Sequence, residues 1–187
     1  MRVMTLDDRR FRETCMLLEQ KVLKSGFRPD IVIGIARGGV YVADCFSNDN
    51  VWSVVCQRGG TSAKKGVVSS VLKRLPAWMN SFLRCVESLS LELHDRFRNP
   101  EIKKPVVDSS LITVLKEGGL NVLVVDDAVD SGATLRNVTY ALRDISANNV
   151  IRTAALTVTR KSPIVMPDYY LYHDRTLMRF PWSEDRR

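Results

Sequence analysis

Short runs of apolar, often β-branched residues alternate along the chain with segments in which apolar residues recur every three or four positions. The runs are typical of strands buried on both faces, and the recurring spacing is typical of amphipathic helices. This alternation predicts an α/β fold with a mainly parallel sheet flanked by helices, in which ligands bind at the carboxyl ends of the strands. The predicted strands are Ile31–Ile35, Val51–Cys56, Leu120–Val125, Thr153–Thr159 and Tyr169–Tyr172, and the predicted helices are Asp7–Lys24, Val40–Phe46, Asp108–Lys116 and Leu135 to about Ser146.

The middle of the chain departs from this alternation. From Val67 to Phe97 the helical spacing continues over a much longer stretch, which predicts a long amphipathic helix or a helix pair, kinked or divided at Pro76. Its apolar stripe is typical of a core or dimer contact. The segment before it is basic and rich in glycine, as in a flexible loop. We therefore expect one domain over 1–187, with a flexible loop and helical insertion at about 60–105.

Composition narrows the class of protein only slightly. The apolar fraction of 45% and the charged fraction of 26% are ordinary for a globular domain, and the longest apolar runs are far too short to span a bilayer. The first residues contain no apolar signal-peptide segment, and the four cysteines form no C-x-x-C pair, so we expect a cytoplasmic protein with reduced thiols and no membrane partner. The net charge of +7 suits a polyanionic small substrate or a nucleic acid.

The richest chemistry follows the predicted strand at Leu120–Val125. Two adjacent acids, Asp126 and Asp127, precede a loop of small polar residues, Asp130–Thr134, and then a helix. Backbone N–H groups, two hydroxyls and the helix N-terminus can converge there on one phosphate. Because paired carboxylates would repel phosphate, they fit sugar hydroxyls or Mg²⁺ instead, which together indicate a phosphorylated sugar. An Asp-rich helix cap would account for one or two of these residues, but not for the whole run.

This stretch, Val122–Thr134, resembles the phosphoribosyl pyrophosphate signature of type I phosphoribosyltransferases, departing from it at Ala128, where a bulkier aliphatic residue is usual. The resemblance implies that Asp126 and Asp127 hold the ribose hydroxyls, with Mg²⁺ nearby. It assigns the 5′-phosphate to the loop that contains Asp130, Ser131, Gly132, Ala133 and Thr134.

A second motif agrees with the first. The residues after the strand Ile31–Ile35 are Ala36, Arg37, Gly38 and Gly39, and they are similar to the pyrophosphate loop of the same family. Glycines let the backbone approach a pyrophosphate, and Arg37 can neutralise it. In relatives the peptide bond matching Arg37–Gly38 is often cis.

The C-terminal part carries a resemblance to the branch that acts on 6-oxopurines. An acid at the position of Asp130 is typical of that branch and can exchange a proton with N7 of a purine. A base-reading lysine matches Lys161, and the tail, about 160–187, is similar to a hood that packs on the base. Aligned on Pro181–Trp182, the base-contacting pair is Leu177 and Met178, although the first of these is often Trp in the family. The Ser-Tyr pair that usually heads the closing loop is replaced by Cys56–Gln57.

The resemblance implies a fold with a small C-terminal hood and an enzyme of purine salvage. It would join xanthine, guanine or hypoxanthine to phosphoribosyl pyrophosphate with Mg²⁺, give a nucleoside 5′-monophosphate and pyrophosphate, and form a homo-oligomer, a dimer or tetramer. Two alternatives stay open. One is a phosphoribosyl pyrophosphate sensor that regulates genes or binds RNA, and the other is transfer to a different base.

Overall fold

The computed structural model describes residues 2–56, 104–174 and 176–182. The predicted closing loop and helical insertion therefore lie outside the described residues, except for Lys104 and Pro105.

A parallel sheet forms the centre of the fold, in the spatial order β3–β2–β4–β5–β6. Its strands are β2 (Ile31–Ile35), β3 (Val51–Val54), β4 (Asn121–Val129), β5 (Val150–Val158) and β6 (Tyr169–His173). Every pairing between these strands is parallel, as the sequence predicts. From β2 the chain first adds β3 on one side and then crosses to β4 on the other. The strand order therefore reverses between β2 and β4, and α/β folds usually bind ligands outside such a reversal.

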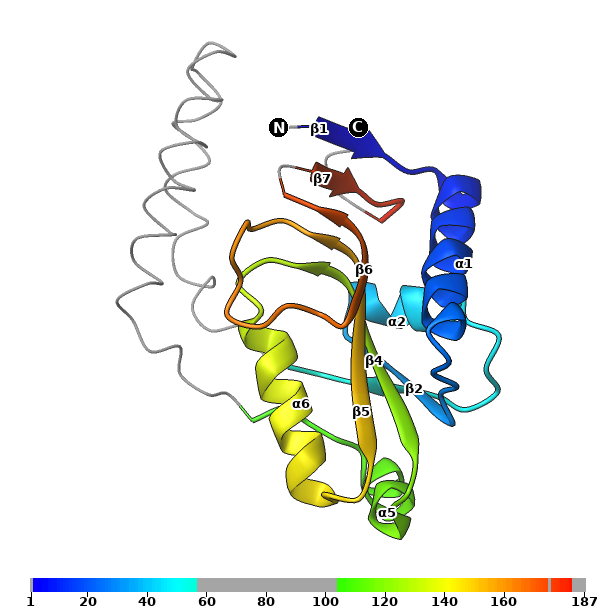
Figure 1. Cartoon of the computed structure of the whole chain (residues 1–187), viewed down its shortest axis with the longest axis vertical. Coiled ribbons are helices and arrows are strands. Elements are labelled where there is room, and N and C mark those ends of the chain that lie inside the picture. The colour runs from blue at the N-terminus through cyan, green and yellow to red at the C-terminus, as the bar shows by residue number, and fades with distance from the viewer. Residues whose placement is uncertain (1, 57–103, 175, 183–187) are drawn as a thin grey trace. The chain divides into compact units, whose positions relative to one another are not determined.

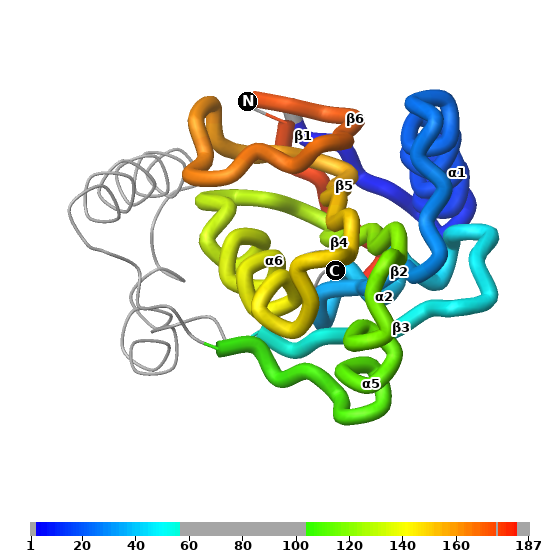
Figure 2. Tube along the Cα trace, turned by 60° about the horizontal axis from the view of Figure 1, so that its bottom comes forward, coloured from blue at the N-terminus to red at the C-terminus, as the bar shows by residue number. Residues whose placement is uncertain are grey.

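Helices cover both faces of this sheet. Alternate side chains of the central strands point to opposite faces: Ile31 and Ile33 pack with α5 (Ser109–Glu117) and α6 (Ala133–Ile145), whereas Val32 packs with α1 (Asp8–Lys24) and α2 (Gly38–Ala43). Figures 1 and 2 show α6 and α1 on opposite sides of β4 and β5. Because β2 and the Val122–Val125 part of β4 are buried on both faces, these two runs contain no polar residue.

Two predicted helices begin one residue later than expected, because their first residues are caps. The carboxylate of Asp7 accepts a hydrogen bond from the backbone N–H of Arg10 at 2.8 Å, and that of Asp108 accepts one from Ser110 at 2.8 Å. Both acids adopt extended backbone angles, as N-cap residues do. At the other end of α5, Gly118 has a φ of 76°, a conformation that glycine accepts without strain.

A second, two-stranded sheet was not predicted. The N-terminal strand β1 (Arg2–Thr5) pairs in parallel with β7 (Thr176–Arg179), which follows the strand that the sequence indicates as the last. The strand β1 thus pairs with a strand from the tail that is predicted to form the hood, and Figure 1 shows β1 beside β7. Both strands are too short and too mixed in polarity to produce a clear alternating pattern.

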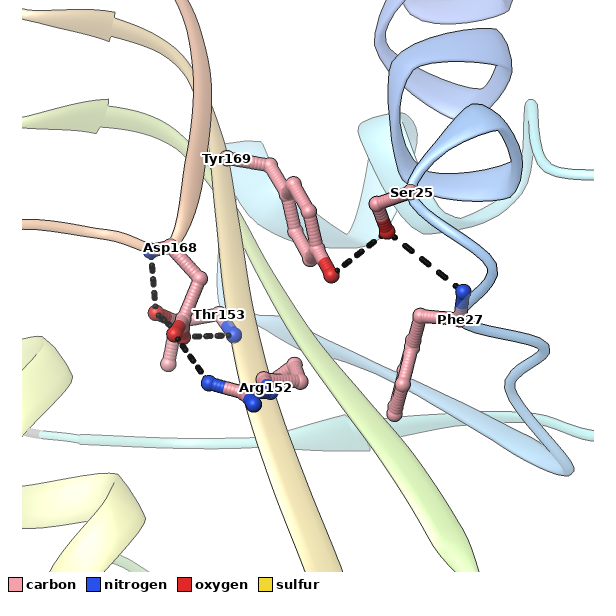
Figure 3. Close-up of polar contacts among 6 residues, drawn as sticks. All are labelled: Ser25, Phe27, Arg152, Thr153, Asp168 and Tyr169. Carbon is pink, nitrogen blue, oxygen red and sulfur yellow. Dashed lines mark hydrogen bonds and ion pairs between the residues drawn. The ribbon is translucent and has the colours of Figure 1, made fainter.

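The strand β6 is fastened to the rest of the sheet by Asp168, which directly precedes it (Figure 3). Asp168 Oδ2 accepts hydrogen bonds from the backbone N–H and the hydroxyl of Thr153 at 2.8 and 2.7 Å, and Oδ1 pairs with Arg152 Nη1 at 2.9 Å. On the other side of the sheet the Tyr169 hydroxyl lies 2.8 Å from that of Ser25, just beyond α1. Asp168 and Tyr169 thus anchor β6 to the rest of the fold.

Among the described cysteines, Cys15 and Cys45 are free thiols. Burial raises the pKa of Cys15 and of Cys45, which disfavours their thiolates. Among the described helices, none combines the length and apolar character needed to cross a membrane.

Candidate functional site

Most of the predicted site residues lie at or after the carboxyl ends of β2, β4 and β5, whereas Leu177 and Met178 lie on β7. These neighbouring strands are parallel, so the segments that follow them emerge at the same edge of the sheet. The strand β4 is longer than predicted and continues through Asp126 and Asp127 to Val129. Its pairing with β2 ends at Gly34–Val125, whereas its pairing with β5 continues to Val129–Val158. The two acids thus lie on the part of β4 that extends beyond β2.

The adjacent acids Asp126 and Asp127 have different surroundings. Asp126 is buried, with only 4% of its surface exposed, and its Oδ1 accepts a hydrogen bond from the N–H of Asp127 at 2.9 Å. Asp127 is half-buried, and its Oδ1 accepts one from the N–H of Ala128 at 2.9 Å. Because successive strand residues point to opposite faces, the two carboxylates project in opposite directions from β4.

The loop after β2 packs directly against the end of β4. A Cβ atom at Gly38 would lie 2.0 Å from Asp127 Oδ2, and one at Gly39 would lie 2.5 Å from the carbonyl oxygen of Val125. Any side chain at either position would therefore displace β4 or its carboxylate. Sequence reasoning attributed these glycines to the approach of a pyrophosphate, but packing between the two motifs already requires them.

The other residues of this loop are more accessible. Arg37 is exposed at the start of α2, and Ala36 is half-buried. The cis peptide bond lies between Ala36 and Arg37, one bond before the position that the resemblance implies.

The loop Asp130–Thr134 adopts a tight conformation that only glycine permits at one position. Gly132 has a φ of 79°, and a Cβ there would lie 2.5 Å from the carbonyl oxygen of Val165. The Ser131 carbonyl accepts a hydrogen bond from Ile164 N–H at 2.8 Å, and the Ser131 hydroxyl accepts one from Ala133 N–H at 3.3 Å. The helix α6 begins at Ala133 without a side-chain cap from Gly132. The loop therefore leads directly into the N-terminus of a helix, as predicted.

Asp130 lies at the end of β4 and contacts the residues that follow β5. Its Oδ1 accepts a hydrogen bond from the Thr159 hydroxyl at 2.9 Å and pairs with Arg160 Nε at 3.0 Å. Lys161, which sequence reasoning linked with Asp130, is exposed. The sequence pointed to this segment through Lys161, the neighbour of Arg160. The register between β4 and β5 is needed to show that Arg160 is the residue that contacts Asp130.

A histidine from the next strand supports this segment. His173, the last residue of β6, lies with Nε2 at 3.2 Å from the carbonyl oxygens of both Arg160 and Lys161. Because both partners are acceptors, the ring must carry its proton on Nε2 to bind them. Sequence reasoning gave His173 no role.

The predicted base-contacting pair is separated by the geometry of β7. Leu177 is 37% exposed, whereas Met178 is 6% exposed and packs in the core with Phe11 and Phe180. Since their side chains point to opposite faces of the strand, a base can meet only one of them through its side chain.

A comparison with known families gives these observations a context. Residues 95–184 match the model of the phosphoribosyl transferase domain. That part of the chain, just under half of it, is similar in sequence to the phosphoribosyl transferase domain. The matched part includes the acids of β4, the loop Asp130–Thr134 and Lys161, but not the loop after β2. No curated protein sequence gives a significant match.

Solved structures share the fold over nearly the whole chain. A purine phosphoribosyltransferase from Pyrococcus horikoshii Ot3 is 21% identical with a TM-score of 0.57, covering 98% of this chain and 96% of that one. The xanthine-guanine-hypoxanthine phosphoribosyltransferase of Helicobacter pylori is 16% identical with a TM-score of 0.59, covering 98% and 95%. A hypothetical protein from Neisseria gonorrhoeae with bound ppGpp is 14% identical with a TM-score of 0.58, covering 97% and 89%. The mainly parallel sheet flanked by helices is therefore the type I phosphoribosyltransferase fold.

Proposed function

We propose that this domain is a purine phosphoribosyltransferase that transfers the phosphoribosyl group of phosphoribosyl pyrophosphate to a 6-oxopurine. The observation that carries the proposal is the contact between Gly38 and the carboxylate of Asp127. Two motifs that are far apart in the sequence, and that were each associated with a different part of the same substrate, meet at the strand reversal between β2 and β4. That edge is where this class of sheet usually binds its ligands.

Each part of phosphoribosyl pyrophosphate has a corresponding group of residues. We assign the ribose hydroxyls to Asp126 and Asp127, which accept hydrogen bonds. We assign the 5′-phosphate to the N–H groups and hydroxyls at the start of α6, contributed by Asp130, Ser131, Gly132, Ala133 and Thr134. The pyrophosphate would lie along Ala36–Gly39, where the exposed guanidinium of Arg37 can offset its charge.

The carboxylates also fit a role for Mg²⁺. This ion is usually held by one or two carboxylates together with substrate phosphates and water. Among the residues that the structure describes, no cluster of three or more metal-binding side chains occurs, so the protein alone offers only a partial site. That donor set suits an ion bound together with the substrate, at Asp126 and Asp127, where it would neutralise charge on the departing pyrophosphate.

The base would approach from the side of β5 and the hood. We propose that Asp130 exchanges a proton with N7 of the purine, that Lys161 donates to the oxygen at C6, and that Leu177, the exposed member of the predicted pair, borders the ring. Pyrophosphate leaves C1 of the ribose as the purine nitrogen bonds to it. The enzyme contributes by orienting both reactants, excluding water and stabilising the leaving group.

A panel of bases tests the proposal. The full chain is incubated with phosphoribosyl pyrophosphate, Mg²⁺ and either hypoxanthine, guanine, xanthine or adenine, and released pyrophosphate and nucleotide are both measured. We expect product with at least one 6-oxopurine and much less with adenine, because adenine has no oxygen at C6 to accept from Lys161. Product from adenine alone would assign the domain to another base.

The competing hypothesis, a sensor that binds nucleic acid, has support in the net charge of +7. The same preparation is therefore tested for retention of RNA across a salt series. Retention that is lost with modest salt would reflect only a basic surface. Absence of product from every base, together with salt-resistant RNA binding, would replace the enzyme by the sensor.

A further inference from the structure

The contact between Asp130 and Arg160 involves two side chains of unequal exposure. The side chain of Arg160 is 18% exposed, whereas that of Asp130 is 63% exposed. The arginine side chain is thus mostly buried, whereas the carboxylate that it pairs with is mostly exposed. An exposed ion pair would contribute little, but a mostly buried guanidinium fixes the position of the group that it holds.

Within the described parts of the chain, hydrogen bonds reach only one oxygen of Asp130. Both Thr159 Oγ1 and Arg160 Nε reach Oδ1, at 2.9 and 3.0 Å, and Oδ2 has no protein partner among the described residues. Two donors on one oxygen restrict rotation of the carboxylate and leave the other oxygen available to a ligand.

The backbone around Arg160 is itself held from both sides. Thr159 N–H donates to the Val129 carbonyl at 2.9 Å, which continues the pairing of β5 with β4 directly before Asp130. His173 Nε2 contacts the Arg160 carbonyl from β6. Three adjacent strand ends therefore fix the carboxylate and its donors in one arrangement, which is the kind of support that a precisely oriented acid requires.

We infer that Arg160, assisted by Thr159, is a positioning residue that holds Asp130 Oδ1 so that Oδ2 faces the nitrogen of the incoming purine. This inference rests on the proposed function and extends it, since sequence reasoning linked Lys161 alone with this part of the site. Arg160 acts through Asp130, whereas Lys161, which is exposed, is left for direct contact with the base.

A double-mutant cycle tests this role. Steady-state kinetics with the best 6-oxopurine are measured for the wild type, Asp130→Asn, Arg160→Gln and the double variant, together with the affinity for phosphoribosyl pyrophosphate. We expect Arg160→Gln to lower kcat by at least about 10-fold, as loss of a hydrogen bond to a charged group does, with that affinity changed by less than about 2-fold. The double variant should be no slower than Asp130→Asn alone, because Arg160 is inferred to act on turnover only through the carboxylate of Asp130.

The chain provides a matched control in Arg152→Gln. This arginine also pairs with an aspartate, but it lies on β5 near its amino end, whereas Arg160 follows the carboxyl end of that strand. It should keep wild-type kcat. Arg160→Lys, which restores a positive donor without the guanidinium geometry, should recover part of the lost turnover, and it replaces the glutamine variant if that one does not fold.

The possible outcomes distinguish failure of the proposed function from failure of the positioning role of Arg160. If the wild type makes no nucleotide from any base, the proposed function fails and the inference with it. If the wild type is active but Arg160→Gln matches Arg152→Gln, or if the effects of Asp130→Asn and Arg160→Gln multiply, the function stands and the positioning role is wrong. A folded Arg160→Lys that recovers nothing would also count against it.

Discussion

At each end of β5 a threonine and an arginine bind an aspartate of a neighbouring segment, but the two aspartates are bound differently. Near its amino end, Arg152 and Thr153 hold Asp168, and after its carboxyl end, Thr159 and Arg160 hold Asp130. In each case a threonine hydroxyl and an arginine from one strand reach a carboxylate on the neighbouring segment. At the amino end both oxygens of Asp168 are engaged, and a backbone N–H is among the donors. At the carboxyl end both donors reach a single oxygen of Asp130.

This difference separates a structural contact from a candidate site. The Asp168 side chain is 33% exposed, and both of its oxygens accept hydrogen bonds that join β6 to β5. The Asp130 side chain is 63% exposed and keeps one oxygen without a partner among the described residues. Residue composition alone does not distinguish the two clusters. The distinction comes from how many acceptor sites the protein itself fills, and from which end of a parallel strand carries them.

The largest expected effect is that of Asp130→Asn on catalysis. If Asp130 exchanges a proton with the purine, its amide cannot do so, and kcat should fall by about 100-fold or more. The affinity for phosphoribosyl pyrophosphate, measured by calorimetry, should stay within about 2-fold, because Asp130 is not assigned to the ribose or the pyrophosphate. A large loss of affinity with unchanged kcat would instead make Asp130 part of the phosphate site.

The corresponding change at the other end, Asp168→Ala, should affect stability instead. It leaves the N–H and hydroxyl of the buried Thr153 without their acceptor, and we expect the free energy of unfolding to fall by about 2–3 kcal/mol. Urea unfolding checks this value, and kcat per folded molecule should be unchanged. A stable Asp168→Ala variant with low kcat would show that the comparison between the two ends is mistaken.

Much of the fold was predictable because the central strands are buried on both faces. Runs such as Ile31–Ile35 have few alternatives to a strand in an α/β protein, and the acids at Asp7 and Asp108 mark helix starts to within one residue. The pair β1 and β7 was missed because four-residue strands show too little periodicity, and because their pairing joins the two ends of the chain. No local pattern contains that information.

The site, like the fold, was predictable only where the information lies in one continuous stretch of sequence. The acids Asp126 and Asp127 and the loop after them were identifiable because their chemistry is contiguous in the sequence. The contact of Asp130 with Arg160 depends on the register between β4 and β5, and the contact of Gly38 with Asp127 depends on the strand order. Sequence reasoning therefore found the residue types at this edge, but it could not find which of them touch.

A smaller effect is expected for Gly38→Ala, which tests the carboxyl edge of the sheet without removing a charge. The new methyl group would overlap the Asp127 carboxylate, and overpacking of this kind costs about 1–3 kcal/mol. Displacement of Asp127 should weaken the binding of phosphoribosyl pyrophosphate by about 10-fold or more, measured by calorimetry. The control is Gly119→Ala, before the amino end of β4, where a Cβ meets nothing within 4 Å although the φ of 73° adds local strain. Equal affinities for the two variants would contradict the proposed contact of Asp127 with the substrate.

The smallest effect is expected for Arg152→Gln. Its ion pair with Asp168 is half-exposed, at 50% for the arginine side chain, and exposed pairs contribute less than about 1 kcal/mol. Thr153 still supplies two hydrogen bonds to Asp168, so β6 should stay attached, and urea unfolding should detect only a slight shift. Added salt should reduce the difference from the wild type, because screening weakens an exposed pair in the intact protein as well. Arg160→Gln removes the same charge from a largely buried position. If the two variants lost equal amounts of stability or kcat, the proposed difference between the two ends of β5 would be wrong.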